Sequence, residues 1–229
     1  MKVQICRFLA VVVMVLGLFV VENNSEANFR IGLMAGPSIG TASSEVPTIA
    51  GFSTSNTGFP AVSYTAGLIG EYMFLSSFSA ELGFFYLKRK FGYTSEISSG
   101  GTVASTSEVT AKYETWMIPL IFRYWLSNTM GLGLGGYYAK GFNSLSMSGS
   151  IKTGTSGPST DFTATAPLDV LKADYGLVAS FVYLYELTKM ISLRGDARIL
   201  FGLDDNKTSI ESKTRLRDGQ ILVGAQISI

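Results

Sequence analysis

Six charged residues of this 229-residue sequence have types and spacings that could do chemistry. They are three carboxylates and three guanidinium groups set in otherwise apolar stretches: Glu71, Glu81, Arg123, Arg194, Asp196 and Arg198. Glu71 and Glu81 flank a short connection near Ser76, and a hairpin turn there would place the two carboxylates side by side. Carboxylates in such a position could share a proton, as catalytic dyads do.

The three arginines favour a structural interpretation over a catalytic one. Like charges that face each other destabilise a hairpin, so cations must lie near them. Perturbed carboxylates also occur in structural networks. The sequence has no histidine, the commonest general base, and Cys6 is its only cysteine. We therefore expect no enzyme activity, no catalytic residue, no cofactor and no bound metal.

Two further motifs could attract phosphate, and neither is specific. Residues 131–136 (Gly-Leu-Gly-Leu-Gly-Gly) lack the following Lys-Ser or Lys-Thr of a phosphate-binding loop. Small side chains on one face of a strand explain this segment better. Residues 88–90 (Lys-Arg-Lys) could contact lipopolysaccharide phosphates, but we interpret them as a solvated basic rim.

The elements that would position all these residues are strands in which apolar and other side chains alternate. Eight segments follow this pattern: residues 29–39, 63–74, 78–87, 115–124, 131–138, 174–185, 191–203 and 220–229. One face of each segment is bulky and apolar, and the other is small and polar. The six charged residues fall on the second face, which suits the narrow interior of an eight-stranded barrel.

The connections between these segments alternate strictly between short and long. The short ones fall near residues 75–77, 127–130 and 187–190, and the long polar ones are residues 40–61, 92–112, 143–172 and 204–217. Outer-membrane barrels have short periplasmic turns and long extracellular loops. The sequence therefore predicts an all-β fold, an eight-stranded antiparallel up-and-down transmembrane β-barrel. The Ser, Thr and Gly content of the long loops predicts mobility.

Composition agrees with a barrel in the outer membrane of a Gram-negative bacterium. Charged residues make up 15% of the chain, against about 25% in a typical soluble domain. A net charge of +1 gives no support for a nucleic-acid partner.

Aromatic residues of the apolar face gather near the strand ends, as two interfacial girdles would. We assign Tyr72, Phe74, Phe78, Phe122, Tyr124, Tyr183 and Tyr185 to the girdle beside the short turns, and Tyr64, Tyr86, Trp116, Tyr138 and Tyr175 to the other.

Two alternative interpretations have to be weighed, one for the first residues of the chain and one for the environment of the barrel. Residues 1–27 have a basic start, an apolar core and small residues before position 28, which predicts a cleaved secretory signal peptide and a barrel of residues 28–229. The alternative is an uncleaved anchor, although the apolar run is short for a membrane helix. A secreted soluble barrel is the other alternative, but its apolar face would have to point inward.

The sequence also resembles the porin-like outer-membrane β-barrel domain family, the PorT-like group of eight-stranded barrels. The resemblance lies in residues 79–86, 113–124, 133–141, 174–177 and 196–203. It implies an outer-membrane location and a barrel fold, and it does not fix one function.

Three functions remain open from the sequence. The first is a structural or surface-interaction barrel whose charged lumen is plugged and whose loops meet lipopolysaccharide or an extracellular ligand. The second is a narrow channel for small solutes or ions, and the third is a membrane enzyme. In each case the expected partners include outer-membrane lipid and, during biogenesis, the barrel assembly machinery. Eight strands leave room for side chains or one small ligand, which favours the plug.

Overall fold

The computed structural model describes residues 29–45, 52–99, 102–142, 144–154, 157–166, 173–203 and 213–229. The regular secondary structure in these ranges consists of eleven β-strands. The described part of the chain contains no helix of the length and hydropathy needed to cross a membrane. The predicted signal peptide lies outside the described residues.

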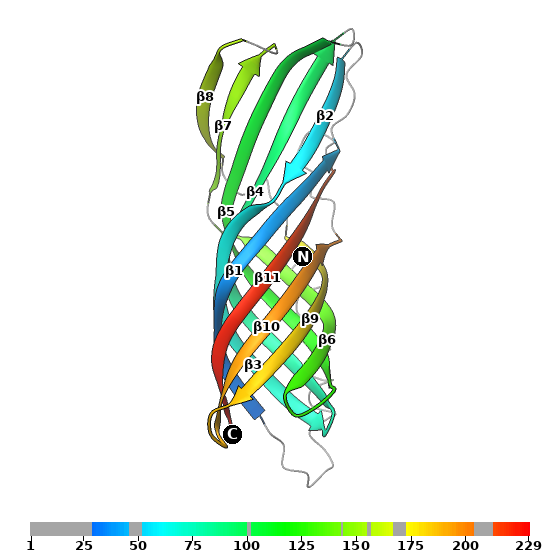
Figure 1. Cartoon of the computed structure of the whole chain (residues 1–229), viewed down its shortest axis with the longest axis vertical. Helices are drawn as coiled ribbons and strands as arrows, with labels where there is room; N and C mark the ends of the chain where they lie inside the picture. Colours follow the sequence, from blue (N-terminus) through cyan, green and yellow to red (C-terminus); the bar gives the residue numbers. More distant parts are fainter. Residues whose placement is uncertain are drawn as a thin grey trace, which may run out of the picture.

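Eight of the strands close into a ring, and Figure 1 shows them wound into a barrel. They are β1 (Phe29–Glu45), β3 (Ala61–Leu75), β4 (Phe78–Ser99), β5 (Thr102–Trp125), β6 (Met130–Gly141), β9 (Asp174–Glu186), β10 (Ile191–Gly202) and β11 (Lys213–Ser228). Every neighbouring pair is antiparallel, and the ring runs β4-β3-β1-β11-β10-β9-β6-β5 before β5 returns to β4. The predicted eight-stranded antiparallel barrel is confirmed.

Three tight connections lie at one end of this ring, which we call the turn end. They join β3 to β4, β5 to β6 and β9 to β10, at the positions that the sequence predicts. The first strand and the end of the chain meet there too, because Ile229 N–H donates to the Phe29 carbonyl at 2.8 Å. The opposite end is the loop end.

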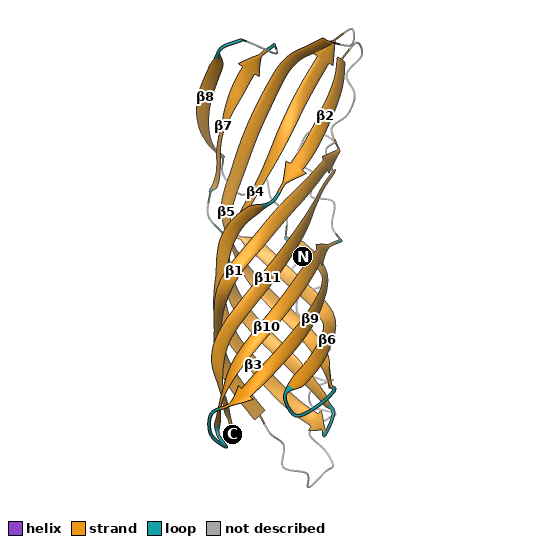
Figure 2. Ribbon diagram, viewed as in Figure 1, coloured by secondary structure: helices purple, strands orange, loops and turns teal. Residues whose placement is uncertain are grey.

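Three additional strands lie beyond the ring at the loop end: β2 (Phe52–Phe59), β7 (Leu145–Thr153) and β8 (Ser159–Ala166). β2 pairs with the outer part of β4, β7 pairs with the outer part of β5, and β8 pairs with β7. We call this five-stranded assembly, in the order β2-β4-β5-β7-β8, the upper sheet. Figure 2 shows it continuing the barrel wall on one side.

The upper sheet corrects the prediction that residues 92–112 and most of residues 143–172 are loops. Residues 92–99 and 102–112 continue β4 and β5 well past the ring. Outside the ring these two strands would leave hydrogen-bonding groups unpaired, and β2 and β7 supply the partners. Parts of residues 40–61 and 204–217 are also strand, since β1 and β11 pair as far as Glu45 and Lys213.

Candidate functional site in the barrel lumen

The structure brings all six predicted charged residues together inside the ring. Glu71, Glu81, Arg123, Arg194, Asp196 and Arg198 come from β3, β4, β5 and β10, and we call them the lower ion cluster. The side chains of all six are completely buried. Strand alternation is what places them there, because each faces the lumen while its sequence neighbours face outward.

Within the lower ion cluster every carboxylate contacts at least two guanidinium groups. Arg123 Nη1 donates to Glu71 at 3.0 Å and to Glu81 at 2.8 Å. Arg194 donates to Glu71 at 3.1 Å, to Asp196 at 3.0 Å and also to Glu81. Arg198 Nη2 donates to Glu81 and Asp196, both at 2.7 Å. Three positive charges thus meet three negative ones, and this pairing favours structural carboxylates over a proton-sharing dyad.

Neutral groups that the sequence analysis did not single out hold this cluster in place. Ser79 Oγ donates to Glu71 at 2.5 Å and accepts from Trp125 Nε1 at 2.9 Å. Arg123 Nη2 donates to Ser180 at 3.3 Å. Each of these residues lies on the lumen face by strand parity, so parity was the signal that could have identified them.

An apolar layer lies next to the lower ion cluster and crosses the whole lumen. Its residues are at most 5% exposed, and every ring strand contributes at least one: Met34, Ile69, Phe85, Leu87, Met117, Ile121, Tyr137, Ala139, Val178, Leu200 and Leu222. The expectation that the inner face is small and polar is therefore wrong at this level. Bulky side chains fit because glycines lie opposite them.

Phe85 shows how the apolar layer is filled. Its ring lies against Gly67 and Gly83, where an added Cβ would meet ring carbons at 2.6 and 2.5 Å. Phe85 also makes a cation–π contact, since the Arg198 guanidinium carbon lies 4.9 Å from the centre of its ring. This stacking joins the apolar layer to the lower ion cluster.

A second ionic group, the upper ion cluster, closes the lumen toward the loop end. Arg89 donates from Nη1 to Asp174 at 2.6 Å and from Nε to Asp218 at 2.9 Å. Tyr113 accepts from Arg89 at 3.3 Å, and the Tyr137 hydroxyl donates to Asp174 at 3.2 Å. These contacts link β4, β5, β6, β9 and β11 across the barrel.

The buried Arg89 corrects the interpretation of residues 88–90 as a solvated rim. Arg89 is only 2% exposed, whereas Lys88 and Lys90 on either side of it are partly exposed. Alternation along β4 explains the difference, because the central residue of the three points inward.

The three levels follow the same order on neighbouring strands. Along β4 from the turn end, Glu81 comes first, Phe85 and Leu87 next, and Arg89 last. On β5 the order is Arg123, Met117 and Tyr113. The lumen is therefore filled by ions, then apolar side chains, then ions again.

The outer wall carries the predicted aromatic residues near both ends. Toward the loop end, the ring centres of Tyr64 and Tyr86 lie 6.0 Å apart and those of Tyr86 and Trp116 lie 5.8 Å apart. Phe142, which the sequence analysis did not include, stacks on Trp116 at 5.0 Å. Near the turn end, Phe78 contacts Tyr124 at 5.0 Å. The remaining assigned residues are also at least partly exposed: Tyr72, Phe74, Phe122, Tyr138, Tyr175, Tyr183 and Tyr185.

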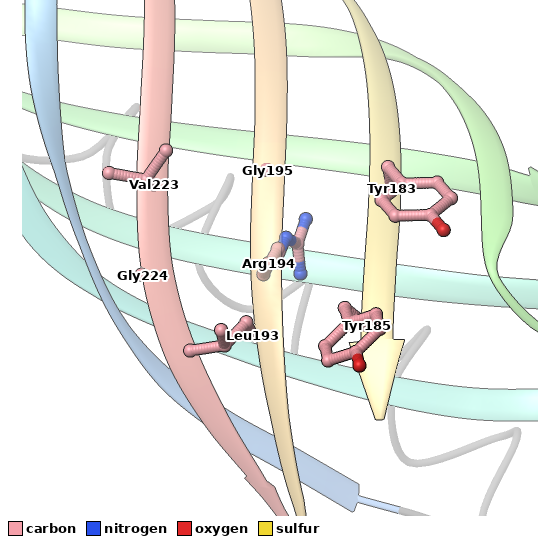
Figure 3. A pocket seen from close by; sticks show the side chains of 7 residues that line it. All are labelled: Tyr183, Tyr185, Leu193, Arg194, Gly195, Val223 and Gly224. Carbon is pink, nitrogen blue, oxygen red and sulfur yellow. The ribbon is translucent and has the colours of Figure 1, made fainter. Parts of the chain in front are cut away.

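A shallow groove of about 430 Å³ lies on the outer wall where β9, β10 and β11 run side by side. Figure 3 shows its lining: Tyr183, Tyr185, Leu193, Arg194, Gly195, Val223 and Gly224. The groove exists because Gly195 has no side chain between its register partners Tyr183 and Val223. Its lining is mainly apolar apart from Arg194, whose guanidinium belongs to the lower ion cluster on the other side of the wall.

Comparisons with known proteins give fold likenesses only. No known protein-family model matches the chain, and no curated protein matches it. The resemblance to the porin-like family therefore stays a prediction.

Three solved structures illustrate the likeness. The outer membrane protein OprG from Pseudomonas aeruginosa is 14% identical, with a TM-score of 0.47 over 89% of this chain and 96% of that chain. Neisserial surface protein A is 12% identical, with a TM-score of 0.42 over 87% and 96%. Ail, the attachment invasion locus protein of Yersinia pestis, is 11% identical, with a TM-score of 0.42 over 90% and 100%.

Proposed function

We propose that this protein is a non-conducting outer-membrane β-barrel of a Gram-negative bacterium, with a structural or surface-interaction role. The observation that carries the proposal is the apolar layer, to which all eight ring strands contribute and whose residues are at most 5% exposed. A hydrated ion would have to lose its water to cross this packed layer, which is costly. The buried hydroxyls of Thr65 and Thr115, on either side of Leu87, could replace only a small part of that water. The ion clusters on both sides of the layer are themselves cross-linked by arginines.

The membrane assignment is supported by the outer wall. Large apolar side chains such as Leu33, Leu134 and Val223 are 65%, 66% and 64% exposed, which is unfavourable in water and suits contact with lipid. Antiparallel closure leaves no free strand edge within the ring, as a bilayer requires. The apolar wall between two aromatic belts therefore supports a membrane-spanning orientation.

Lysines beside the loop-end belt support contact with lipopolysaccharide. Lys90 and Lys112 are register partners on β4 and β5, and Lys140 is the register partner of Trp116. Lys88 Nζ lies 5.7 Å from the centre of the Tyr64 ring. Phosphates at this level of the outer leaflet would meet several cations at once.

The upper sheet is the part that we assign to surface interaction, because its two faces differ. One row across four strands contains a tyrosine, a valine, a glycine and a phenylalanine: Tyr93, Val109, Gly149 and Phe162. The adjacent row on the other face is small and polar: Gly92, Thr110, Ser148 and Thr163. The first face also exposes Ile97 and Ile151, by 40% and 44%. A partner outside the cell would gain apolar contact there.

Recording from purified protein in planar lipid bilayers tests the closed lumen. We expect no steady conductance from the wild type, from Arg194→Ala or from Arg89→Ala, because the apolar layer remains in all three. A porin reconstituted in the same way confirms that insertion can be detected. Steady conductance that changes with Arg194→Ala would show a channel and reject the closed barrel.

A further inference from the structure

We propose that the turn end of the lumen binds a small monovalent anion, such as a halide, between Arg30, Gln226 and Arg194. Within the described residues, four buried nitrogen atoms of these side chains have no acceptor: Arg30 Nε, Arg30 Nη1, Gln226 Nε2 and Arg194 Nε. Gln226 and Arg194 are each only 1% exposed. All four atoms are hydrogen-bond donors, so the missing partner must be an acceptor.

The three side chains come from adjacent strands. Arg30 on β1 is the register partner of Ser228 on β11, and Gln226 lies two residues away on the same face of β11. Arg194 on β10 donates from Nη1 to Gln226 Oε1 at 3.4 Å, which leaves the amide nitrogen of Gln226 free to donate elsewhere. A hydrogen bond thus joins Arg194 to Gln226, and the register places Arg30 on the next strand toward the turn end.

The charges at this end also favour an anion. The lower ion cluster is balanced by itself, and Arg30 adds a fourth guanidinium. Its register partner Glu71 already accepts from Arg123, Arg194 and Ser79. Glu186, the other carboxylate near Arg30, is exposed and therefore screened by water. Arg30 itself is only partly exposed. Water could complete the hydrogen bonds of these donors, but an anion would also balance the charge of the Arg30 guanidinium.

Trp125 provides a local probe of this site. The Arg30 guanidinium carbon lies 5.1 Å from the centre of the Trp125 ring, and Trp125 is 5% exposed. The sequence has two tryptophans, so Trp116→Phe leaves Trp125 as the reporter. Iodide is titrated into this variant in detergent at constant ionic strength, with gluconate as the compensating anion. Iodide bound at Arg30 should quench the fluorescence to a plateau.

The decisive comparison adds Arg30→Met, with Arg217→Met as a matched control because Arg217 is exposed on β11 at the loop end. We expect the plateau to disappear with Arg30→Met and to stay with Arg217→Met. Linear quenching of equal slope in all three proteins would mean that the donors hold only water, and the proposal would be rejected.

A second variant covers the case in which Arg30→Met does not fold, as judged by loss of heat-modifiable migration on a gel. Gln226→Met removes one donor without changing the charge. It should raise the iodide concentration at half-quenching several-fold, and an unchanged value would overturn the proposal. The measurement needs neither a bilayer nor a conductance, so its outcome is independent of the closed-barrel proposal.

Discussion

Glu71 and Glu81 lie directly opposite each other on β3 and β4, and the same nitrogen of Arg123 donates to both, at 3.0 and 2.8 Å. Two carboxylates in this position would repel each other without a cation between them. The hairpin of β3 and β4 therefore depends on a charge supplied by β5. The contacts of Arg194 with the same two carboxylates also link this hairpin to β10, which is distant in sequence.

Removing that cation should destabilise the barrel strongly. Arg123→Met keeps a long apolar stem and leaves Glu71 and Glu81 with one fewer partner each. Breaking a buried ion pair from one side typically costs about 3–5 kcal/mol. The free energy of unfolding in urea, followed by far-ultraviolet circular dichroism, measures the loss. Arg217→Met is the control, since exposed substitutions stay within about 0.5 kcal/mol, and equal midpoints for the two variants would contradict the prediction.

Much of the barrel could be predicted from the sequence because alternation and connection length are local signals. Residues 115–124 alternate clearly, and the tight turn at residues 187–190 stands where the sequence predicts it. The upper sheet is different, because it depends on pairings between distant segments. Its strands do alternate, since residues 145–153 read Leu-Ser-Met-Ser-Gly-Ser-Ile-Lys-Thr. The high serine content of this segment, however, is also typical of a loop.

The lumen could be predicted only in part for a similar reason. Strand parity assigned Glu71 and Arg194 to the same interior, and a charge there needs a partner, so the lower ion cluster followed from the sequence. Parity also assigned Phe85 and Met117 to the interior. The mean polarity of the inner face, however, does not indicate that such residues form one continuous apolar layer. That layer depends on the stagger between strands, which aligns these residues across the barrel.

The two faces of the wall should respond differently to one substitution. At Gly195 an added Cβ would meet nothing within 4 Å, because the position opens onto the outer groove. At Gly176 it would meet the Phe201 carbonyl oxygen and, at 2.7 Å, a ring carbon of Tyr137. We expect Gly195→Val to be as stable as the wild type and Gly176→Val to lose about 1–3 kcal/mol of stability by overpacking.

Heat-modifiable gel migration and urea unfolding compare the two glycine variants. Gly195→Val serves as the control for the change in backbone entropy and strand propensity, which both substitutions share. If Gly195→Val proved to be the less stable of the two, the assignment of the two faces would be wrong.

The stability of the upper ion cluster should depend on the balance of its charges, so neutralising the carboxylates should compensate for loss of the arginine. Arg89→Met leaves Asp174 and Asp218 buried without their cation, which we expect to cost about 3–5 kcal/mol. Adding Asp174→Asn and Asp218→Asn removes both unpaired charges and should restore most of the stability. Urea midpoints of the single and triple variants test this. A triple variant less stable than Arg89→Met alone would show that shape, not charge, governs this level of the lumen.

The hairpin of β7 and β8 should be removable without loss of the barrel. It pairs with β5 through residues 105–112 only, outside the ring. Ala139 on β6 and Asp174 on β9 are register partners, so position 140 faces position 173. Replacing residues 143–172 with Asn-Gly therefore leaves a four-residue hairpin loop (residues 141 and 142, Asn and Gly) between the two strands. We expect the shortened protein to keep its heat-modifiable migration and to lose any adhesion to cells or surfaces that the wild type confers on bacteria expressing it.

Replacing Asp161 and Thr163 with Ser, which keeps the polar face of β8, is the matched control for surface expression. Failure of the shortened chain to assemble would show that the upper sheet is needed to close the ring, and retained adhesion would place the interaction elsewhere.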